Sequence, residues 1–339
     1  MGRLISNLDE IPFPDFTLYK RSYKILPYSS MNIVAGRGCP FNCSFCYNQV
    51  LKKMFHEDFK SGNYIRLMSP RRVINEIKHF IAVRGKKPKY VRFWDDTFTS
   101  NKKWIFEFLD LYKKEIGIPF TCLGRADQIN DELAKKLKQS GISIIYWSIE
   151  SGSERLRNKI CKKNISNDAI LRCKDTLNKY KIPFRPFNMI ALPTETFEDA
   201  LLTVKINQEV GNKYPLASIY DPYPGTEMAE FITANELMKE ELTSNSHFKT
   251  QYEGSILKCD PKILRLSQLF FYFVRFPRLN PVLKWWIKKD HFAINKLLFY
   301  IPYFYIFCRT YKYTLSEMVI ISLRLFKPMT DFKKVLRSK

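Results

Sequence analysis

Three cysteines lie close together near the amino terminus, in the run Gly-Arg-Gly-Cys39-Pro-Phe-Asn-Cys43-Ser-Phe-Cys46. The spacing Cys-x3-Cys-x2-Cys puts three thiols on one short loop. A cubane iron–sulfur cluster has four iron corners and normally takes four cysteine ligands. Three cysteines would leave one iron open to a substrate or a cofactor, so the pattern indicates a catalytic cluster rather than one that only stores electrons.

Two other interpretations of these cysteines are a zinc site and three unrelated core thiols. A structural zinc site usually has four ligands arranged as two pairs, and no second Cys-x2-Cys or His pair follows nearby. His56 is ten residues further on and stands alone. Two glycines before the first cysteine and a proline after it permit the chain to wrap tightly. We therefore favour a cluster bound by Cys39, Cys43 and Cys46.

The composition is that of a globular protein from a reducing compartment. Of 339 residues, 45% are hydrophobic, and eight cysteines are too few for a disulfide scaffold. The first ten residues are mixed and charged, unlike a secretory signal peptide, so we expect a cytoplasmic location. No segment reaches about 18 uncharged apolar residues, the length of a membrane-spanning helix. The formal net charge of +23 fits an anionic membrane, nucleic acid or an acidic partner, or simply a lysine-rich solvated surface.

Six short apolar runs alternate with amphipathic helical stretches, a pattern typical of a parallel α/β fold. The predicted strands span residues 31–35, 89–94, 120–123, 142–149, 184–192 and 216–220. Helices are predicted to begin at Ser69, Ser100, Asn130 or Asp131, Ser166 and Thr196, with Gly141 ending the third. Such units form either an open doubly wound sheet or a partial barrel. Function lies at the carboxyl ends of the strands in both.

Chemically useful side chains follow the predicted strands. The cysteine loop follows the first strand, and the next three are followed by Asp95-Asp96-Thr97, by Arg125 with Asp127, and by Glu150-Ser151-Gly152-Ser153. Pro193-Thr194-Glu195-Thr196 and Pro222-Tyr-Pro-Gly225-Thr226 follow the last two. The carboxyl ends of parallel strands meet at one edge of a sheet. We therefore expect all six segments to lie on one rim.

The cysteine motif, with Phe45 before its last cysteine, resembles the defining motif of the radical S-adenosylmethionine (SAM) superfamily. Six segments resemble the catalytic part of its cobalamin-dependent members: LDEIPFPDF, RGCPFNCSFCYN, FWDDTFT, GRADQIND, SIESGSERLR and PYPGTEM. The resemblance covers residues 10–230. It implies an α/β fold with a partial (β/α)6 TIM-like barrel over residues 31–230. The composition predicts an extended lead-in at 1–30 and a basic, aromatic, mostly helical region at 231–339.

The resemblance also implies a mechanism with two cofactors, a 4Fe-4S cluster and SAM. The open iron binds the amino and carboxylate groups of SAM, and one electron cleaves SAM to methionine and a 5′-deoxyadenosyl radical. That radical takes a hydrogen atom from the substrate. An electron donor such as flavodoxin or ferredoxin is implied, whereas the substrate is not readable. The alternative is a non-catalytic, cluster-containing binding protein that acts through its basic carboxy-terminal region.

Roles around SAM follow from the same resemblance. Asp95 and Asp96 stand where members hold the methionine amino group, with a loop cap or ion pair as the alternative. Glu150 stands where they bind the ribose hydroxyls, and Ser151 shares its turn or caps the next helix. Arg125 is a candidate to bind the SAM carboxylate, with an ion pair to Asp127 or Glu150 as the alternative. Phe45 and Tyr47 are candidates to contact adenine, with core packing as the alternative.

The chain departs from the family pattern at two places. The family's Gly-Leu-Pro-Gly-Glu-Thr reads Ala191-Leu-Pro-Thr194-Glu-Thr here, so close backbone approach to a ligand is in doubt. Cobalamin-dependent relatives also carry a cobalamin-binding domain before the LDEIPFPDF segment, and no Asp-x-His-x2-Gly motif occurs in this sequence. Either cobalamin is not used, or another chain supplies it, or the sequence is truncated.

The carboxy-terminal part of the sequence has its own character. Residues 263–339 carry 15 Lys/Arg against 3 Asp/Glu, with Trp285 and Trp286 beside lysines. Three interpretations are a helical cap over the active site, peripheral contact with an anionic membrane, and nucleic-acid binding. We rank them in that order and do not expect a nucleic-acid partner.

Overall fold

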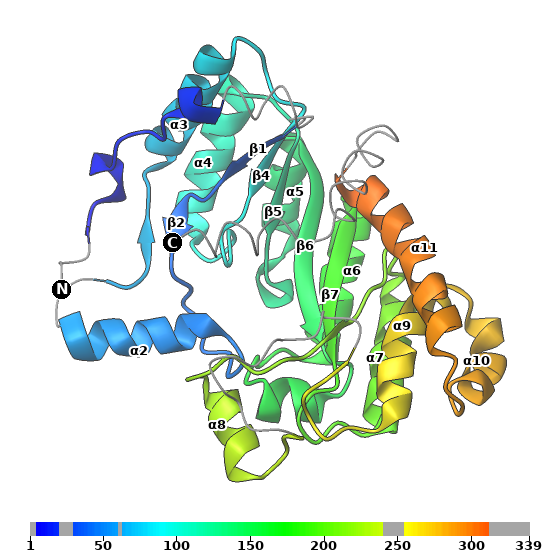
Figure 1. Ribbon diagram of the computed structural model, residues 1–339. Helices are drawn as coiled ribbons and strands as arrows, with labels where there is room; N and C mark the ends of the chain where they lie inside the picture. Colours follow the sequence, from blue (N-terminus) through cyan, green and yellow to red (C-terminus); the bar gives the residue numbers. More distant parts are fainter. Residues whose placement is uncertain (1–4, 20–29, 60–62, 240–253, 312–339) are drawn as a thin grey trace, which may run out of the picture.

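Six parallel strands, hydrogen-bonded in the order β1-β4-β5-β6-β7-β8, form the sheet that positions the functional loops. The computed structural model describes residues 5–19, 30–59, 63–239 and 254–311. The strands are β1 Ser30–Ile33, β4 Tyr90–Phe93, β5 Phe120–Leu123, β6 Ile142–Glu150, β7 Phe184–Ile190 and β8 Ser218–Ile219. The sheet curls into a half-barrel (Figure 1). This is the predicted partial barrel, and each of the six predicted strands is present.

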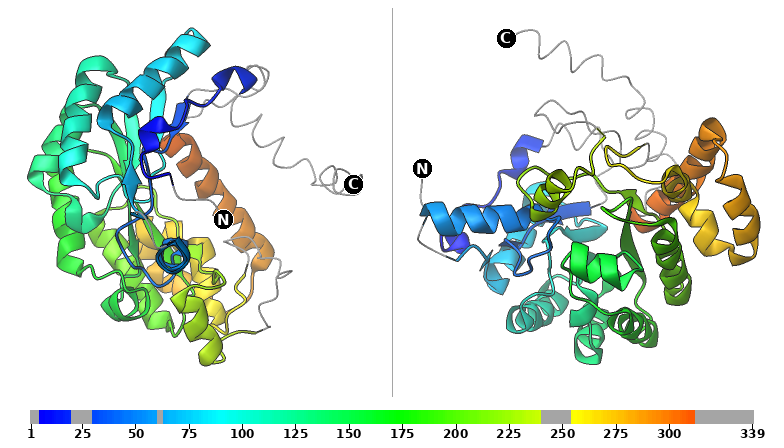
Figure 2. Two further views of the ribbon diagram at one scale, coloured as in Figure 1. Left: turned by 90° about the vertical axis from the view of Figure 1, so that its left-hand side faces the viewer. Right: turned by 90° about the horizontal axis from the view of Figure 1, so that it is seen from below.

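Five helices cover the convex face of this sheet, as the two views in Figure 2 show. They are α3 Pro70–Arg84, α4 Lys102–Glu115, α5 Asp131–Gln139, α6 Asn167–Lys179 and α7 Phe197–Val210. Side-chain oxygens of Ser69, Asn130, Ser166 and Thr196 accept the N-terminal capping bonds of α3, α5, α6 and α7. These four predicted helix starts are confirmed.

Two predicted helix boundaries are wrong by one residue. Helix α4 begins after Asn101, not Ser100, because the Asn101 amide oxygen accepts the backbone N–H of Trp104 at 3.0 Å. Helix α5 is capped by Ser140, and Gly141 follows it with a left-handed φ of 88°. Both shifts are local, and neither changes which face of the helix is buried.

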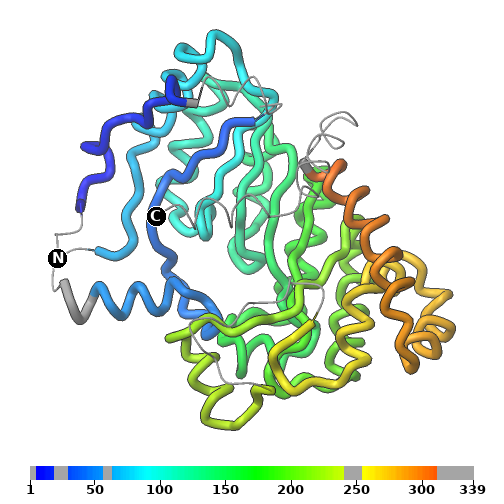
Figure 3. Tube along the Cα trace, viewed as in Figure 1, coloured from blue at the N-terminus to red at the C-terminus, as the bar shows by residue number. Residues whose placement is uncertain are grey.

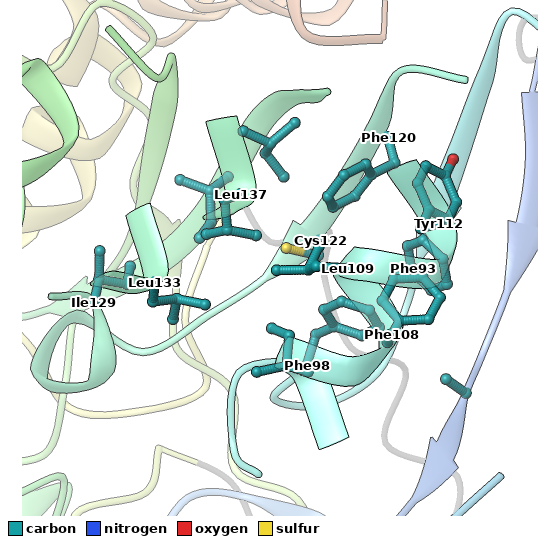
Figure 4. Packing of buried hydrophobic residues seen from close by; sticks show 14 of the residues in the cluster. Phe93, Phe98, Phe108, Leu109, Tyr112, Phe120, Cys122, Ile129, Leu133 and Leu137 are labelled. Carbon is teal, nitrogen blue, oxygen red and sulfur yellow. The ribbon is translucent and has the colours of Figure 1, made fainter. Parts of the chain in front are cut away.

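An aromatic cluster packs the helices against the middle of the sheet (Figure 4). The Phe93 ring on β4 lies 4.5 Å from that of Phe98 and 5.2 Å from that of Phe108, and Trp104 stacks on Phe108 at 5.2 Å. All four side chains are buried. Burying a side chain of this size stabilises a fold by about 1.5–3 kcal/mol. The cluster therefore fixes the end of β4, from which residues 95–97 extend.

Short elements at the carboxyl ends of the strands complete the rim. They are the antiparallel pair β2 Gly36–Arg37 and β3 Arg66–Leu67, helix α2 Tyr47–Phe59, the 3-10 turn η3 Ala126–Gln128, the π-helix η4 Arg155–Ile160 and helix α8 Glu227–Ala234. Two 3-10 turns, η1 Leu8–Glu10 and η2 Phe16–Tyr19, form the described part of the lead-in. The lead-in is tied to α3, because Asp9 accepts the backbone N–H of Ser69 at 2.8 Å.

The carboxy-terminal part of the described chain is helical, as predicted. It comprises α9 Pro261–Arg275, η5 Pro277–Leu279, α10 Asn280–Trp286 and α11 Phe292–Tyr311. Helix α9 packs on the sheet edge next to α7, and α11 packs on α9, where Tyr272 donates to the carbonyl of Leu298 at 3.1 Å (Figure 3). None of the helices in the described ranges is both long and apolar enough to cross a membrane.

Candidate active site

The cysteine loop connects β2 to α2 and is held by backbone bonds to two other elements. The N–H of Ser44 donates to the carbonyl of Cys161 at 3.1 Å, and the carbonyl of Ser44 accepts the N–H of Met228 at 3.0 Å. Gly38 has a φ of 84°, and a Cβ there would lie 2.8 Å from the carbonyl oxygen of Tyr64. Only glycine fits both the conformation and the space, so Gly38 fixes the backbone direction in which the chain enters the cysteine loop.

All three cysteines line one cavity of about 150 Å³, which we call the cluster cavity. Its other walls are Phe41, Phe45, Asn48, Asp96, Thr97, Leu123, Gly124, Arg125, Trp147, Ser148, Glu150, Lys163 and Phe187. The cluster cavity thus gathers Cys39, Cys43, Cys46, Phe45, Asp96, Arg125 and Glu150 from the predicted site residues. It is not lined by Tyr47, Asp95 or Ser151.

Glu150 ends β6 and forms a buried ion pair at the cavity wall. Its Oε1 accepts the Nζ of Lys163 at 2.7 Å, and the same Nζ donates to the hydroxyl of Ser148 at 2.8 Å. Both charged side chains are less than a tenth exposed. Glu150 also has a left-handed φ of 63°, which strains a residue with a Cβ. The carboxylate is therefore fixed in place by its backbone and by its cation.

The two adjacent aspartates have different environments. Asp95 is buried, its Oδ2 accepts the backbone N–H of Ala35 at 3.0 Å, and burial raises the pKa of its carboxyl to about 6. It fastens the end of β4 to the segment that leads into the cysteine loop. Asp96 is exposed and lines the cluster cavity. Of the two carboxylates, Asp96 is the one placed to accept hydrogen bonds from a bound ammonium group.

Arg125 lies in the cavity wall with most of its guanidinium engaged. Its Nε pairs with Asp127 at 3.0 Å, its Nη2 donates to the carbonyl of Lys163 at 2.5 Å, and its Cζ lies 3.8 Å from the ring centre of Phe41. The ion pair with Asp127, considered as an alternative from sequence, is thus present. Nη1 is the guanidinium nitrogen left for a ligand.

Tyr47 and Ser151 lie outside the cavity. Tyr47 is the first residue of α2, is about half exposed, and its ring lies 6.4 Å from that of Tyr223. Ser151 is fully buried, and its hydroxyl accepts the backbone N–H of Ser153 at 3.2 Å. It also lies 3.4 Å from the hydroxyl of Thr203. Ser151 therefore joins the end of β6 to α7.

Sequence reasoning did not find the residues that support the cysteines. The amide of Asn48 donates to the sulfur of Cys46 at 3.7 Å and is itself oriented by the Tyr64 hydroxyl, which donates to it at 2.6 Å. The Thr97 hydroxyl lies 3.5 Å from the sulfur of Cys39. The Asn48 amide thus stabilises a thiolate at Cys46 and orients it toward a metal. The Thr97 hydroxyl donates its one hydrogen to the carbonyl of Asp96 at 2.7 Å, so it can only accept from the Cys39 thiol. The sequence offered one signal for these residues: Asn48 lies two positions after Cys46, and Thr97 lies next to Asp96.

The donor set fits a cubane cluster better than a single metal ion. Within the described ranges, no three His, Cys, Asp or Glu side chains converge as the ligands of one ion would. Cysteines that hold a cubane bind different irons, so their sulfurs are spread around a common cavity. Burial raises the pKa of the Cys43 and Cys46 thiols. Iron must therefore displace the protons of these thiols when it binds.

The family follows from a comparison with known proteins. Residues 33–205 match the radical SAM superfamily, and this match covers just over half of the chain. The chain belongs to the radical SAM superfamily. The matched segment begins in β1, contains the cysteine loop and Glu150, and ends in α7.

The chain is similar to a curated relative and to two solved structures of radical SAM enzymes. It is 32% identical over 278 residues to "Uncharacterized methyltransferase PH0819" of Pyrococcus horikoshii, covering 79% of this chain and 57% of that protein. It resembles the methyltransferase TsrM of Kitasatospora setae, solved with tryptophan and a SAM analogue. The TM-score is 0.57 at 13% identity, and the match covers 76% of this chain and 54% of TsrM. It also resembles the cobalamin-dependent enzyme OxsB, solved with aqua-cobalamin and SAM. The TM-score is 0.53 at 13% identity, and the match covers 87% of this chain and 49% of OxsB.

Those two structural likenesses concern the fold. The chain spans about half the length of the curated relatives that it matches.

Proposed function

We propose that the chain is a radical SAM enzyme in which Cys39, Cys43 and Cys46 hold three corners of a 4Fe-4S cluster. SAM would occupy the fourth corner. The observation that carries this proposal is the convergence of three thiols with Asp96 and Glu150 on one cavity. When bound and reduced, the cluster would supply the electron that cleaves SAM to methionine and a 5′-deoxyadenosyl radical.

The chain's own residues would bind and orient SAM. Asp96 would accept hydrogen bonds from the methionine ammonium group. Glu150 has one oxygen on Lys163 and would offer the other to the ribose hydroxyls. The Nη1 of Arg125 would donate to the carboxylate, and Phe45 would provide an apolar wall for adenine. Asp95, Tyr47 and Ser151 would act at most through their neighbours.

The test is anaerobic reconstitution with iron and sulfide, followed by dithionite and SAM. We expect about four irons per chain, visible absorption of a cluster, and release of 5′-deoxyadenosine measured by chromatography. Cys43→Ala should lose both cluster and cleavage, whereas Cys308→Ala, on α11, should keep both. A cluster without SAM cleavage would favour the non-catalytic binding protein. Cluster binding by the Cys43→Ala variant at the wild-type level would refute the ligand assignment.

Methyl transfer is the reaction we propose, because the Pyrococcus horikoshii relative and TsrM are both named as methyltransferases. It would use cobalamin supplied by another chain. Transfer of a methyl group from one SAM to cobalamin would leave S-adenosylhomocysteine, and hydrogen abstraction after reductive cleavage of a second SAM would leave 5′-deoxyadenosine. A methyl-transferring enzyme should therefore release both products, whereas cleavage alone releases only 5′-deoxyadenosine. Equilibrium dialysis of the purified chain against hydroxocobalamin tests whether another chain has to supply the cobalamin. Stoichiometric binding by the chain alone would contradict supply from a partner.

An external one-electron donor is also required, and the net charge of +23 favours a small acidic carrier such as a flavodoxin or a ferredoxin. Raising the ionic strength weakens such an encounter by screening. SAM cleavage driven by reduced flavodoxin should therefore slow as salt increases, while cleavage driven by dithionite changes much less. Equal salt dependence with both reductants would exclude a charge-steered encounter.

We further propose that the outer surface of α10 and α11 contacts an anionic membrane. Val282 and Trp285 on α10, and Leu297 and Ile301 on α11, are each more than half exposed. Residues 276–311 also carry six Lys/Arg and one Asp. Exposed apolar side chains among lysines suit the interface of a membrane with anionic lipids. This helical pair lies at one edge of the molecule (Figure 1).

Co-sedimentation with vesicles tests the membrane proposal. The chain should bind phosphatidylglycerol vesicles more than phosphatidylcholine vesicles, and Trp285→Glu with Leu297→Glu should reduce binding at least tenfold. The control is Leu202→Glu on α7, which removes an exposed leucine of a different surface. Equal loss with the control, or no preference for anionic vesicles, would refute a docking surface at α10–α11.

A further inference from the structure

A second cavity, of about 390 Å³, lies between the concave face of the sheet and α11. Its walls come from Glu150, from Arg185, Phe187, Asn188 and Met189 of β7, from Leu216 and Ser218 at β8, and from Tyr303, Ile306 and Phe307 of α11. Glu150 and Phe187 also line the cluster cavity. The volume is in the range of small-molecule sites. The two cavities therefore share a wall, and we call the larger one the α11 cavity.

Most of the α11 cavity is apolar and much of it is aromatic. The Phe187 ring stacks on that of Tyr146 at 5.7 Å with an interplanar angle of 8°, which gives a flat double layer on the sheet side. Tyr303 and Phe307 face it from α11. Flat aromatic walls favour a ligand with an extended apolar or aromatic body.

Four polar side chains interrupt this apolar lining, namely Glu150, Asn188, Ser218 and the buried cation Arg185. Arg185 is 8% exposed and lines the cavity, and its Nε has no hydrogen-bond partner. Among the residues that the structure describes, its Nη1 donates to the Thr310 hydroxyl alone, at 3.5 Å. No acidic side chain within the described ranges forms an ion pair with it. A buried guanidinium without an anion is expensive to desolvate, and its planar fork matches a carboxylate.

We propose that the α11 cavity is the substrate site and that it takes a carboxylate-bearing molecule with a flat apolar body, held by Arg185. The inference rests on the proposed function and names the substrate class for it. The α11 wall lies beyond the residues matched by the family, 33–205. Arg185, the proposed carboxylate anchor, lies within the matched residues on β7, whereas α11 contributes the facing apolar wall.

The sheet register also sets the length of this substrate. Arg185 is the Cα partner of Tyr146, whereas Glu150 is the partner of Asn188, three residues further along β7. At about 3.3 Å per residue, Arg185 lies about 10 Å along the sheet from the level of Glu150. The carboxylate and the reacting atom of the substrate should thus be separated by roughly that distance.

A matched pair of probes tests the site without knowledge of the substrate. We would measure fluorescence anisotropy of 1-pyrenebutyrate and of neutral 1-pyrenebutanol on the full chain. The wild type should bind the butyrate at least tenfold more tightly. Arg185→Met should remove that preference, whereas Arg172→Met, which removes an exposed arginine on α6, should keep it. Ser218→Trp, which fills the cavity, should weaken both probes.

Equal affinity of the wild type for the two probes would overturn the proposal, and this comparison needs no variant. An equal loss with Arg172→Met, or no loss with Ser218→Trp, would overturn it as well, because binding would then lie elsewhere. Probe binding does not depend on SAM cleavage. Absence of 5′-deoxyadenosine together with an intact butyrate preference would count against the proposed function alone, and the reverse result would count against the α11 cavity alone.

Discussion

The replacement Glu195→Gln should change how the stability of the protein depends on pH. The Glu195 carboxyl lies after β7 and is buried; its Oε2 accepts the backbone N–H of Leu192 at 3.0 Å, while its Oε1 has no hydrogen-bond partner among the described residues. Burial raises its pKa to about 8 from an ordinary 4.5. In the folded chain it therefore stays protonated where the unfolded chain has ionised. This pKa difference destabilises the fold progressively as the pH rises from about 4.5 to 8.

The magnitude follows from the two pKa values. Each pH unit within this window removes about 1.4 kcal/mol from the free energy of unfolding. Between pH 6 and pH 9 the wild type should lose about 3 kcal/mol through Glu195. Gln has the shape of the protonated acid and cannot ionise, so the variant should be free of this loss. Asp95 and Asp221, whose pKa values are raised to about 6, titrate identically in both proteins.

The assay is urea unfolding followed by circular dichroism at pH 6, 7, 8 and 9, with both proteins in the same cluster state. The difference in unfolding free energy, variant minus wild type, should grow by about 1.4 kcal/mol per pH unit from pH 6, more slowly as the pH nears 8, and then level off. Glu198→Gln, at an exposed position on the first turn of α7, is the matched control. Parallel curves for wild type and Glu195→Gln would show that the carboxyl is not buried as described.

Three further changes have separable outcomes. Lys163→Met leaves the buried Glu150 carboxylate without its cation, so unfolding should become easier by about 3–5 kcal/mol, measured by urea titration; the exposed Lys162→Met should show little change. Gly152→Ala would place a Cβ 2.1 Å from the carbonyl oxygen of Leu202, so we expect a loss of at least 1–3 kcal/mol and a lower melting temperature. Ser69→Ala removes the cap of α3 and should cost about 1 kcal/mol without altering iron content.

The strands and most helix starts could be predicted because their causes are local. Buried parallel strands read as continuous apolar runs, which is why the run at 142–149 marks β6 almost to the residue. Capping requires a short polar side chain just before an amphipathic stretch. Thr196 meets this rule and forms a complete capping box with Asp199.

The rest of the site depends on contacts between distant parts of the chain. Glu150 and Lys163 are 13 residues apart and meet only because the π-helix η4 turns the chain back toward the end of β6. Strands β2 and β3 have two residues each, too few for a periodic pattern. The sequence likewise offered no reason to separate Asp95 from Asp96, since only the fold buries one and exposes the other.

The altered turn after β7 shows what the two missing glycines would have supplied. Ala191 and Thr194, which stand where the family has glycine, have left-handed φ values of 59° and 61°. The chain thus keeps a backbone suited to glycine while carrying side chains that strain it. Arg155 holds the turn by donating to the Thr194 carbonyl at 3.0 Å and to Asp199 at 2.8 Å. A Cβ at 191 and a side chain at 194 also limit how closely a ligand can approach this backbone.

The end of β6 has to serve both cavities, which explains why it is held so firmly. Glu150 lines the cluster cavity and the α11 cavity, so any shift of this residue would change the proposed SAM site and the proposed substrate site together. A radical must reach its substrate over a short, fixed distance, because water or a second orientation would divert it. A strained φ, a buried lysine and the packing of Gly152 on α7 each remove freedom from this one turn. The effects of Lys163→Met and Gly152→Ala on the free energy of unfolding should therefore be coupled. The double variant should lose an amount that differs from the sum of the two single losses, as is found for neighbouring sites in one network.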